Sequence, residues 1–444
     1  MDQDQLIPVE FPGKVYLSEL ASMVGKKVFL GGWAEHTRDL GKIVFIIMRD
    51  RSGRIQLTLK KGECDPKFIE IAKELTPESA IICSGTVVKA PTEQGIEVKV
   101  DFLKVVSLAK TPLPVDMFAK TTKYDTLLDW RMLDLRRPER FAVFKIESTL
   151  ISGFREYLDS HGFVEIFSPV INAMATEGGA EVFWLNYFKK GAFLRQSPQL
   201  HKQMTVGAFE KVYEIGPAFR AELHHTRRHL CEFTSVDVEM AWIHSEEDLM
   251  TLQENLIRHM FKKVAEECTR ELALLNVEIE IPTAPFPRIS YPKAYEILAE
   301  KGKKLEFGTE VDHDAELALT EYVREKFGHD FYFLTKFPFA IRPPYHMKDS
   351  DDPRLTRSMD LIYRGLEITT GAQREHRYDI FVSQIHEKGL NPENFGKYLE
   401  SFKYGIPPHG GFGLGISRLT QSLLRLENIR DAVLYPRDPE RLEP

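Results

Sequence analysis

Two arginines lie in short motifs that are almost 200 residues apart. Arg220 belongs to Phe-Arg-Ala-Glu at 219–222, and Arg418 ends Gly-Leu-Gly-Ile-Ser-Arg at 413–418. An in-line attack at a phosphorus atom spreads negative charge over the equatorial oxygens. Fixed guanidinium groups can hold that charge with paired hydrogen bonds and without reorganising. Each motif alone is a weak signal, but phosphoryl or nucleotidyl transfer would explain why two such arginines matter, and Arg220 and Arg418 are therefore the candidate catalytic residues.

Two acidic residues flank a predicted hairpin turn between these motifs. If Arg364 and Gly365 form a two-residue turn, Ile362 lies opposite Glu367, and Asp360 lies on the same face as Glu367. Carboxylates on one face repel each other unless a cation lies between them, and Mg²⁺ with phosphate oxygens meets that need. The alternative is a pair of acids that face solvent.

The composition is typical of a globular protein of about two to three domains. The chain has 444 residues, of which 43% are hydrophobic and 28% charged, and its net charge is −7. No apolar run approaches the roughly 20 residues that span a bilayer, and the N-terminus lacks a signal-peptide pattern. We therefore expect a soluble, cytoplasmic protein with no membrane partner. Because the net charge is negative, any RNA contact must come from a local basic surface and a dedicated fold.

The cysteines and histidines give no strong metal pattern. The four cysteines, at 64, 83, 231 and 268, include no C-x-x-C pair, which argues against disulfides and a thiolate zinc site. His225 and His229 could lie one helical turn apart as metal ligands, but no Glu lies between them as in a zincin. We therefore predict no zinc.

Residues 13–107 alternate in the manner of β-strands. Five runs do so, with a turn at 50–53 and a short helix at 66–75 between the third and fourth runs. This order describes an OB-fold, a barrel that commonly binds oligonucleotides. A barrel used only for packing or dimerisation is the alternative. We assign 1–107 to this domain and the proline-punctuated segment 108–126 to a linker.

The remaining residues, 127–444, mix helices and strands without regular alternation. Apolar residues at helical spacing predict a helix over 143–158, and Gly162 is placed to end it. A capping box at 245–248 begins a second helix, and strand-like runs include 331–334. The mixture predicts an α+β domain in which helices flank an antiparallel sheet.

The motifs follow the order found in one enzyme family. Residues 162–169 resemble motif 1, 219–222 resemble motif 2 and 408–418 resemble motif 3 of the class IIb aminoacyl-tRNA synthetases, archaeal type. The resemblance covers nearly the whole chain. It implies ATP-dependent activation of an amino acid, transfer of that amino acid to the 3′ end of tRNA, and a homodimer built through the segment of Pro169. A proline that simply ends a strand is the alternative for Pro169.

By this resemblance, ATP would lie against motifs 2 and 3. Arg220 would contact the α-phosphate and the reacting carboxylate, and Glu222 would contact the adenine amino group. Phe233 would stack on adenine, and Arg418 would contact the γ-phosphate. The other predicted ATP-binding residues are Ala221, Arg228, His229, Leu230, Glu367, Gly415, Ile416 and Ser417.

The same resemblance assigns the acidic pair to magnesium. Asp360 and Glu367 would hold Mg²⁺ bound to ATP, and Thr370 would be a further ligand that also contacts the amino acid. Strict strand alternation from Glu367 instead places Thr369 on the acidic face. The sequence leaves the choice between the two threonines open.

The amino-acid pocket resembles that of the aspartyl branch of the family. Glu177 and Asp237 would share the α-amino group of L-aspartate, whereas Lys202 and Arg374 would bind its side-chain carboxylate. The other predicted pocket residues are Gln199, Leu200 and His201. A buried ammonium without a carboxylate partner costs several kcal/mol, so Lys202 would also penalise asparagine. An asparaginyl enzyme, a tRNA-independent amide ligase and a non-catalytic RNA-binding paralogue are the alternatives.

The N-terminal domain resembles the OB-fold that binds the anticodon. By that resemblance Phe45 would stack on a base, Gln56 would hydrogen-bond a base edge, and Arg38 would belong to the same interface. Phe45 as a barrel-core residue is the alternative. Glu35 replaces the aromatic or histidine residue common in the archaeal type. The predicted partner is tRNA(Asp), with tRNA(Asn) as a second candidate.

Overall fold

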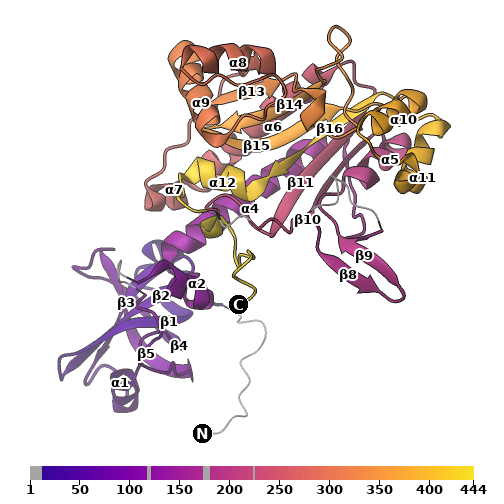
Figure 1. The fold of residues 1–444 in the computed structure, drawn as a ribbon. Coiled ribbons are helices and arrows are strands. Elements are labelled where there is room, and N and C mark those ends of the chain that lie inside the picture. The colour runs from indigo at the N-terminus through magenta and orange to yellow at the C-terminus, as the bar shows by residue number, and fades with distance from the viewer. Residues whose placement is uncertain (1–12, 118–121, 174–180, 224–225) are drawn as a thin grey trace. The chain divides into compact units, whose positions relative to one another are not determined.

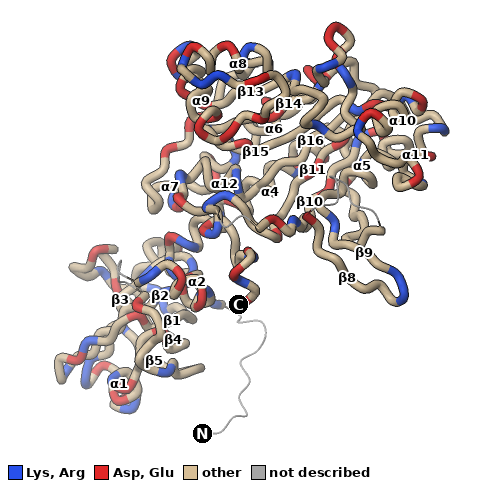
Figure 2. Tube along the Cα trace, in the orientation of Figure 1, with Lys and Arg blue, Asp and Glu red and all other residues tan. Residues whose placement is uncertain are grey.

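The computed structural model describes residues 13–117, 122–173, 181–223 and 226–444. The chain divides into two compact units, Met1–Pro138 (unit 1) and Glu139–Pro444 (unit 2). The predicted boundaries at 107 and 126 both fall inside unit 1. Figure 1 shows a strand-rich unit 1 and a unit 2 that combines helices and strands. Acidic and basic residues are interspersed along both units (Figure 2).

Unit 1 is a closed five-stranded barrel, as predicted. Its strands follow the order β1 (Lys27–Asp39), β2 (Ile43–Asp50), β3 (Gly53–Lys60), β5 (Ile96–Ser107) and β4 (Ser79–Lys89). Alternate residues of β2, namely Val44, Ile46 and Met48, are fully buried in the barrel core. The predicted helix after the third strand is α1 (Pro66–Lys73), and the Asp65 side chain caps its N-terminus. The short helices of unit 1 are η1 (Leu17–Met23), α2 (Tyr124–Asp129) and α3 (Arg131–Asp134).

The segment predicted as a linker is anchored to unit 1 where the structure describes it. Val115 and Met117 are buried and cluster with Leu127 of α2. Near the start of the segment, the Thr76 hydroxyl donates a hydrogen bond of 2.6 Å to the Ala109 carbonyl. The described part of the segment is therefore attached to unit 1 through these contacts.

Unit 2 is built on an eight-stranded sheet. The strand order is β12 (Arg288–Ser290), β13 (Phe331–Thr335), β14 (Ser358–Tyr363), β15 (Leu366–Gln373), β16 (His409–Gly415), β11 (Glu232–Ala241), β10 (Lys211–Phe219) and β6 (Val164–Glu165). The predicted antiparallel pairing is confirmed from β13 to β10. Both edge pairs, β12 with β13 and β6 with β10, are parallel. A separate small sheet contains β7 (Ile171–Asn172), β9 (Lys190–Leu194) and β8 (Trp184–Tyr187).

Three groups of helices cover the large sheet and its ends. The first, α4 (Pro138–Ser160), α6 (Glu246–Glu267), α7 (Thr269–Leu275) and α12 (Ile416–Leu424), shares a core with the sheet. The second, α8 (Tyr291–Glu300) and α9 (His313–Phe327), packs on β12 to β14. The third is α5 (Gln199–Phe209), α10 (Tyr378–Glu387) and α11 (Gly396–Ser401). The 3₁₀-helices of unit 2 are η2 (Phe339–Ile341), η3 (Pro392–Phe395), η4 (Phe402–Tyr404) and η5 (Ile429–Ala432).

Two of the helix signals in the sequence are confirmed. The capping box forms at Ser245 and Asp248, at the N-terminus of α6. Helix α4 ends just before Gly162, whose φ of +76° is the left-handed conformation that favours glycine. Within the described ranges, no helix is both long and apolar enough to cross a bilayer.

Candidate active site and nucleic-acid interface

Strand alternation creates the site on the face of the sheet opposite the core of α4, α6 and α12. On β11, Val236 and Val238 are in that core, so Asp237 and Glu239 lie on the opposite face. On the neighbouring β16, glycines fill the corresponding positions. A side chain at Gly411 would overlap the Glu239 carboxylate, because a Cβ there would lie 2.2 Å from Oε2. The glycines of motif 3 therefore leave room for the acidic residues of β11.

A cavity of about 900 Å³ lies over this face. Most of the predicted amino-acid and ATP residues line it: Gln199, Arg220, Glu222, Arg228, His229, Leu230, Phe233, Asp237, Glu367, Thr370, Arg374, Gly415, Ser417 and Arg418. Segments that are far apart in sequence thus contribute to one cavity. Its volume falls in the range of pockets that bind cofactors and other small molecules.

Four charged residues form a compact, buried network beside the cavity. The Lys202 ammonium lies 3.0 Å from Asp237 Oδ1 and 3.4 Å from Glu239 Oε2. Glu239 is also paired with Arg374, whose Nε donates to Oε1 at 3.0 Å. Both cations therefore converge on one carboxylate. They lower the pKa of Glu239 against the effect of burial, which alone would raise it.

Glu239 is a member of this network that the predicted site omits. A sequence signal was available, because Glu239 follows Asp237 by two residues on a strand with alternating valines. Arg374 has further acceptors in the carbonyl of Gly411 at 3.0 Å and the Gln199 side-chain oxygen at 3.3 Å. The guanidinium group is thus held on several sides within a buried environment.

The hairpin of β14 and β15 forms as predicted, with one difference. Arg364 and Gly365 both have positive φ, of 52° and 77°, as a type I′ turn requires, and Ile362 lies opposite Glu367. The register then shifts, so Asp360 pairs with Thr370 and not with the position that strict alternation requires. A β-bulge, in which one strand has an extra residue, explains this shift.

The bulge settles which threonine lies on the acidic face. Thr370 donates a short hydrogen bond to Asp360 Oδ1. Thr369 instead points into the core, where it donates to Gln253 of α6 at 2.6 Å. The expectation from strict alternation, that Thr369 shares the face of Glu367, is wrong because the extra residue reverses the alternation.

Arg342 joins the acidic face from outside the motifs. Its two terminal nitrogens donate to Asp360 at 2.6 Å and Thr370 at 3.2 Å, and its guanidinium lies 3.5 Å from the Phe337 ring centre. Burial nevertheless raises the pKa of Asp360 to about 6, and the neighbouring Glu367 adds to this increase. Arg342 belongs to none of the motifs, and nothing in the sequence singles it out.

The donor set of this face fits a magnesium ion that is shared with phosphate. Asp360, Glu367 and Thr370 supply oxygen atoms, the ligand type that Mg²⁺ prefers. Among the described residues, no group of three or more His, Cys, Asp or Glu side chains could hold a metal by itself. Protein-only coordination is therefore not indicated here.

The two motif arginines both line the cavity. The Arg220 guanidinium lies 5.6 Å from the centre of the Phe233 ring, and one of its nitrogens lies 3.7 Å from Glu222 Oε1. Arg418 Nη1 lies 3.3 Å from Glu367 Oε1. The arginines thus lie beside the residues predicted to contact adenine and metal. Arg228 reaches α9, where it contacts the His313 ring.

Some predicted residues lie away from the cavity or outside the described residues. Leu200 is buried against α10 and α11, and Ile416 is fully buried in the core behind the sheet. His201 is half-buried and does not line the cavity. Asp360, Lys202 and Ala221 do not line the cavity itself. Glu177, His224 and His225 lie outside the described residues.

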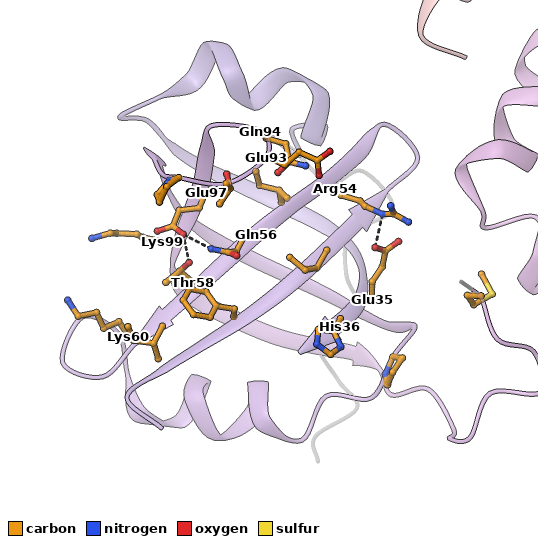
Figure 3. Close-up of a pocket in the computed structure, with 18 of the residues that line it drawn as sticks. Glu35, His36, Arg54, Gln56, Thr58, Lys60, Glu93, Gln94, Glu97 and Lys99 are labelled. Carbon is orange, nitrogen blue, oxygen red and sulfur yellow. Dashed lines mark hydrogen bonds and ion pairs between the residues drawn. The ribbon is translucent and has the colours of Figure 1, made fainter. Parts of the chain in front are cut away.

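A second cavity, of about 1210 Å³, lies on the outer surface of the barrel in unit 1 (Figure 3). Strand pairing aligns two rows of side chains across this surface: Arg38, Phe45 and Thr58 in one, His36, Ile47 and Gln56 in the other. Phe45 is half-buried and lines the cavity, whereas the core residues of β2 are its neighbours Val44 and Ile46. The alternative that Phe45 is a barrel-core residue is therefore wrong.

A carboxylate of β5 fixes the polar residues of this cavity. Glu97 Oε2 accepts hydrogen bonds from Gln56 Nε2 at 2.8 Å and from Thr58 Oγ1 at 2.7 Å (Figure 3). Because the Gln56 amide nitrogen is committed to Glu97, its carbonyl oxygen is presented elsewhere as an acceptor. Arg38 is exposed next to Phe45 but does not line the cavity.

Glu35 is buried beside the same cavity. Its two oxygens lie 2.8 Å from Arg49 Nε and 2.7 Å from Arg54 Nε. Arg54 extends to the cavity surface, where Figure 3 shows it joined to Glu35. Glu35 therefore holds the Arg54 side chain at the cavity.

Comparison with known families identifies both units. Residues 123–439 match the family described as tRNA synthetases class II (D, K and N), and residues 28–106 match the OB-fold nucleic acid binding domain. The chain belongs to the class II tRNA synthetases. The predicted fold, an OB-fold barrel followed by a class II synthetase sheet with helices, is confirmed.

Relatives of this synthetase are similar over nearly their whole length. Aspartate–tRNA(Asp) ligase of Thermococcus kodakarensis is 46% identical, over 97% of this chain and 99% of that protein. Aspartate–tRNA(Asp/Asn) ligase of Methanopyrus kandleri is 48% identical, over 95% of this chain and 96% of the relative.

Solved structures of synthetases with two different amino-acid specificities share the fold. The asparaginyl-tRNA synthetase of Pyrococcus horikoshii complexed with asparaginyl-adenylate has a TM-score of 0.91 and 37% identity, over 97% of this chain and 99% of that one. The aspartyl-tRNA synthetase of Entamoeba histolytica has a TM-score of 0.89 and 34% identity, over 100% of this chain and 96% of that one. The fold is thus common to synthetases for aspartate and for asparagine.

Proposed function

We propose that this synthetase activates L-aspartate with ATP and transfers it to tRNA(Asp), with tRNA(Asn) as a second candidate acceptor. The observation that carries the substrate assignment is the pair of buried cations, Lys202 and Arg374, on the single carboxylate of Glu239. A substrate carboxylate can accept hydrogen bonds from both cations. An amide would turn its own donors toward them. Relatives at 44–48% identity that charge aspartate support the same assignment.

Asparagine is the second candidate substrate. The similarity to the asparaginyl-tRNA synthetase of Pyrococcus horikoshii favours it at the level of fold. The cationic pocket opposes it, because a site built from donors leaves buried polar groups unpaired when the ligand also donates. The two substrates can be separated directly by a rate measurement.

The proposed reaction depends mainly on positioning and charge stabilisation. The α-carboxylate of aspartate attacks the α-phosphate of ATP, which gives aspartyl-adenylate and pyrophosphate, and the terminal adenosine hydroxyl of tRNA then takes the aspartyl group. Arg220 would stabilise charge at the α-phosphate, and Arg418 would hold the γ-phosphate. Asp237 would accept a hydrogen bond from the substrate ammonium. We assign no residue as a dedicated base.

Magnesium belongs to this proposal together with ATP. When bound, the ion would neutralise phosphate charge during the displacement. Asp360, Glu367 and Thr370 would hold it, and the raised pKa of Asp360 supports a cation at this face. Arg342 would keep Asp360 and Thr370 in place through its two hydrogen bonds.

The barrel of unit 1 is proposed to bind the anticodon. Phe45 supplies an aromatic surface for stacking, and Gln56 supplies an acceptor for a base edge that carries N–H groups. Exposed Arg38 would contact phosphate. The relatives include ligases named for tRNA(Asp) alone and for tRNA(Asp/Asn), so we leave both tRNAs in the proposal. The proposed location is the cytoplasm, where tRNA is charged for translation.

A homodimer is also part of the proposal. Three large aromatic side chains near motif 1 and on the β8–β9 hairpin are strongly exposed: Phe167 by 82%, Trp184 by 70% and Phe188 by 89%. Large aromatic side chains that are this exposed are typical of protein interfaces. A second copy of the chain fits this surface by the resemblance of residues 162–169 to motif 1.

ATP–pyrophosphate exchange tests the substrate assignment. We expect exchange with L-aspartate and at least about 100-fold less with L-asparagine at equal concentration, since unpaired buried donors cost a few kcal/mol. Charging of tRNA(Asp) and tRNA(Asn) transcripts then identifies the acceptor. Faster exchange with asparagine would overturn the proposal.

A further inference from the structure

His346 lies next to Arg374 but belongs to none of the synthetase motifs. The two residues form an isolated antiparallel bridge, and His346 lines the same cavity as Arg374. Only 4% of the His346 surface is exposed. Its Nε2 lies 3.3 Å from Arg374 Nη1, within hydrogen-bond distance.

The chemistry of this contact defines the protonation state and tautomer of the His346 imidazole. A guanidinium group can only donate, so Nε2 of His346 must accept and the proton of the neutral ring must be on Nδ1. Burial, followed by the charge of Arg374, holds the pKa of His346 well below its usual range. Arg342, Lys388 and Lys202 add further positive charge around it. The ring is therefore a neutral acceptor among four cations.

His346 and Gln199 accept hydrogen bonds from the two terminal nitrogens of Arg374. Gln199 Oε1 accepts from Nη2 at 3.3 Å, while His346 Nε2 accepts from Nη1. Glu239 and the carbonyl of Gly411 take the other contacts, at Nε and Nη2. These contacts fix the orientation of the Arg374 guanidinium. One N–H of Nη1 has no acceptor among these groups.

The same two side chains carry donors without acceptors. Gln199 Nε2 and His346 Nδ1 are buried and have no hydrogen-bond partner among the described residues. Buried donors of this kind are rare and require explanation, such as an ordered water or a ligand. Both belong to residues that line the cavity. An anionic ligand could accept hydrogen bonds from these two donors as well as from Arg374.

We propose that His346 is a positioning residue for amino-acid selection, which as a neutral acceptor orients Arg374 toward the side-chain carboxylate of the substrate. This inference rests on the proposed aspartate specificity. An aliphatic residue at 346 would remove the acceptor for Nη1, so Arg374 could turn away from the orientation that a carboxylate needs. The residue would then matter for aspartate binding and not for ATP.

The test compares two substitutions in the full-length protein. His346→Leu removes the acceptor, whereas His346→Gln retains one at a similar distance from the backbone. We expect His346→Leu to raise the aspartate KM in ATP–pyrophosphate exchange by about tenfold or more, equivalent to about 1.4 kcal/mol. His346→Gln should recover most of this loss, with the ATP KM within twofold of the parent in both. His259→Leu, a histidine of α6 outside the cavity, is the matched control.

Several outcomes would overturn the inference. An unchanged aspartate KM in His346→Leu would remove the residue from selection. An equal rise in both variants, or an ATP KM that rises as much as the aspartate KM, would indicate a general structural role. Thermal unfolding of each variant shows whether the fold is retained. If the parent enzyme exchanges with asparagine and not aspartate, the proposed function itself fails, and the role of His346 in carboxylate selection fails with it.

Discussion

Replacing Lys202 by methionine should nearly abolish aspartate activation and leave ATP binding intact. Lys202 is 1% exposed, and its ammonium contacts Asp237 at 3.0 Å and Glu239 at 3.4 Å. The carbonyls of Phe412 and Val238 accept two more hydrogen bonds, at 3.2 Å and 3.4 Å. Methionine has a similar length and flexibility, so the change removes the charge with little change in volume.

The expected size of the effect follows from burial. Removing one partner of a buried ion pair costs about 3–5 kcal/mol, because the other charge stays buried without compensation. In the variant, Glu239 retains only Arg374, and a substrate carboxylate would add a further negative charge beside them. Since about 1.4 kcal/mol corresponds to tenfold, kcat/KM for aspartate should fall at least about 100-fold.

The assay is ATP–pyrophosphate exchange with the KM of each substrate determined separately. The proposed ATP contacts come from other residues, so the KM for ATP should stay within about threefold. Thermal unfolding monitored by circular dichroism shows whether the variant is folded. A folded variant with an unchanged aspartate KM would remove Lys202 from the pocket and refute the reasoning.

Three further predictions concern the metal face, the barrel and the interface. Burial raises the pKa of Asp360 to about 6, so protonation of Asp360 stabilises the fold increasingly as the pH falls through 6, whereas the proposed binding of Mg-ATP requires the ionised form. Titration should show weaker Mg-ATP binding as the pH falls below about 6, and Asp360→Asn should bind weakly with no such pH dependence. Glu97→Gln should free the Gln56 amide to reorient and raise the KM for tRNA several-fold in charging assays, without changing exchange. Phe167→Glu should shift the protein toward monomer in sedimentation experiments, and an unchanged dimer would argue against this surface.

The sequence predicts the elements because local signals and burial agree. The capping box at Ser245, the barrel strands and the turn at Arg364 and Gly365 depend on neighbouring residues, and each forms as expected. The position of Thr370 depends on a β-bulge. Strand alternation cannot predict a bulge, because a bulge interrupts the alternating pattern on which the prediction depends.

The composition of the site is predictable in part. Motif residues such as Arg220 and Arg418 meet at one cavity, as their chemistry suggests. Arg342 and His346 come from the segment before β14 and carry no motif of their own. Their role depends on contacts with Asp360 and Arg374 that only the folded chain creates. Glu239 is an intermediate case, since strand alternation would have placed it beside Asp237.

Initial rates of ATP–pyrophosphate exchange, with aspartate and asparagine compared at equal concentration, test the central claim most directly. The account predicts rapid exchange with aspartate and at least about 100-fold slower exchange with asparagine, because a side-chain amide would turn N–H donors toward the proposed cationic pair, Lys202 and Arg374. Exchange that is equal for both amino acids, or faster with asparagine, would contradict it.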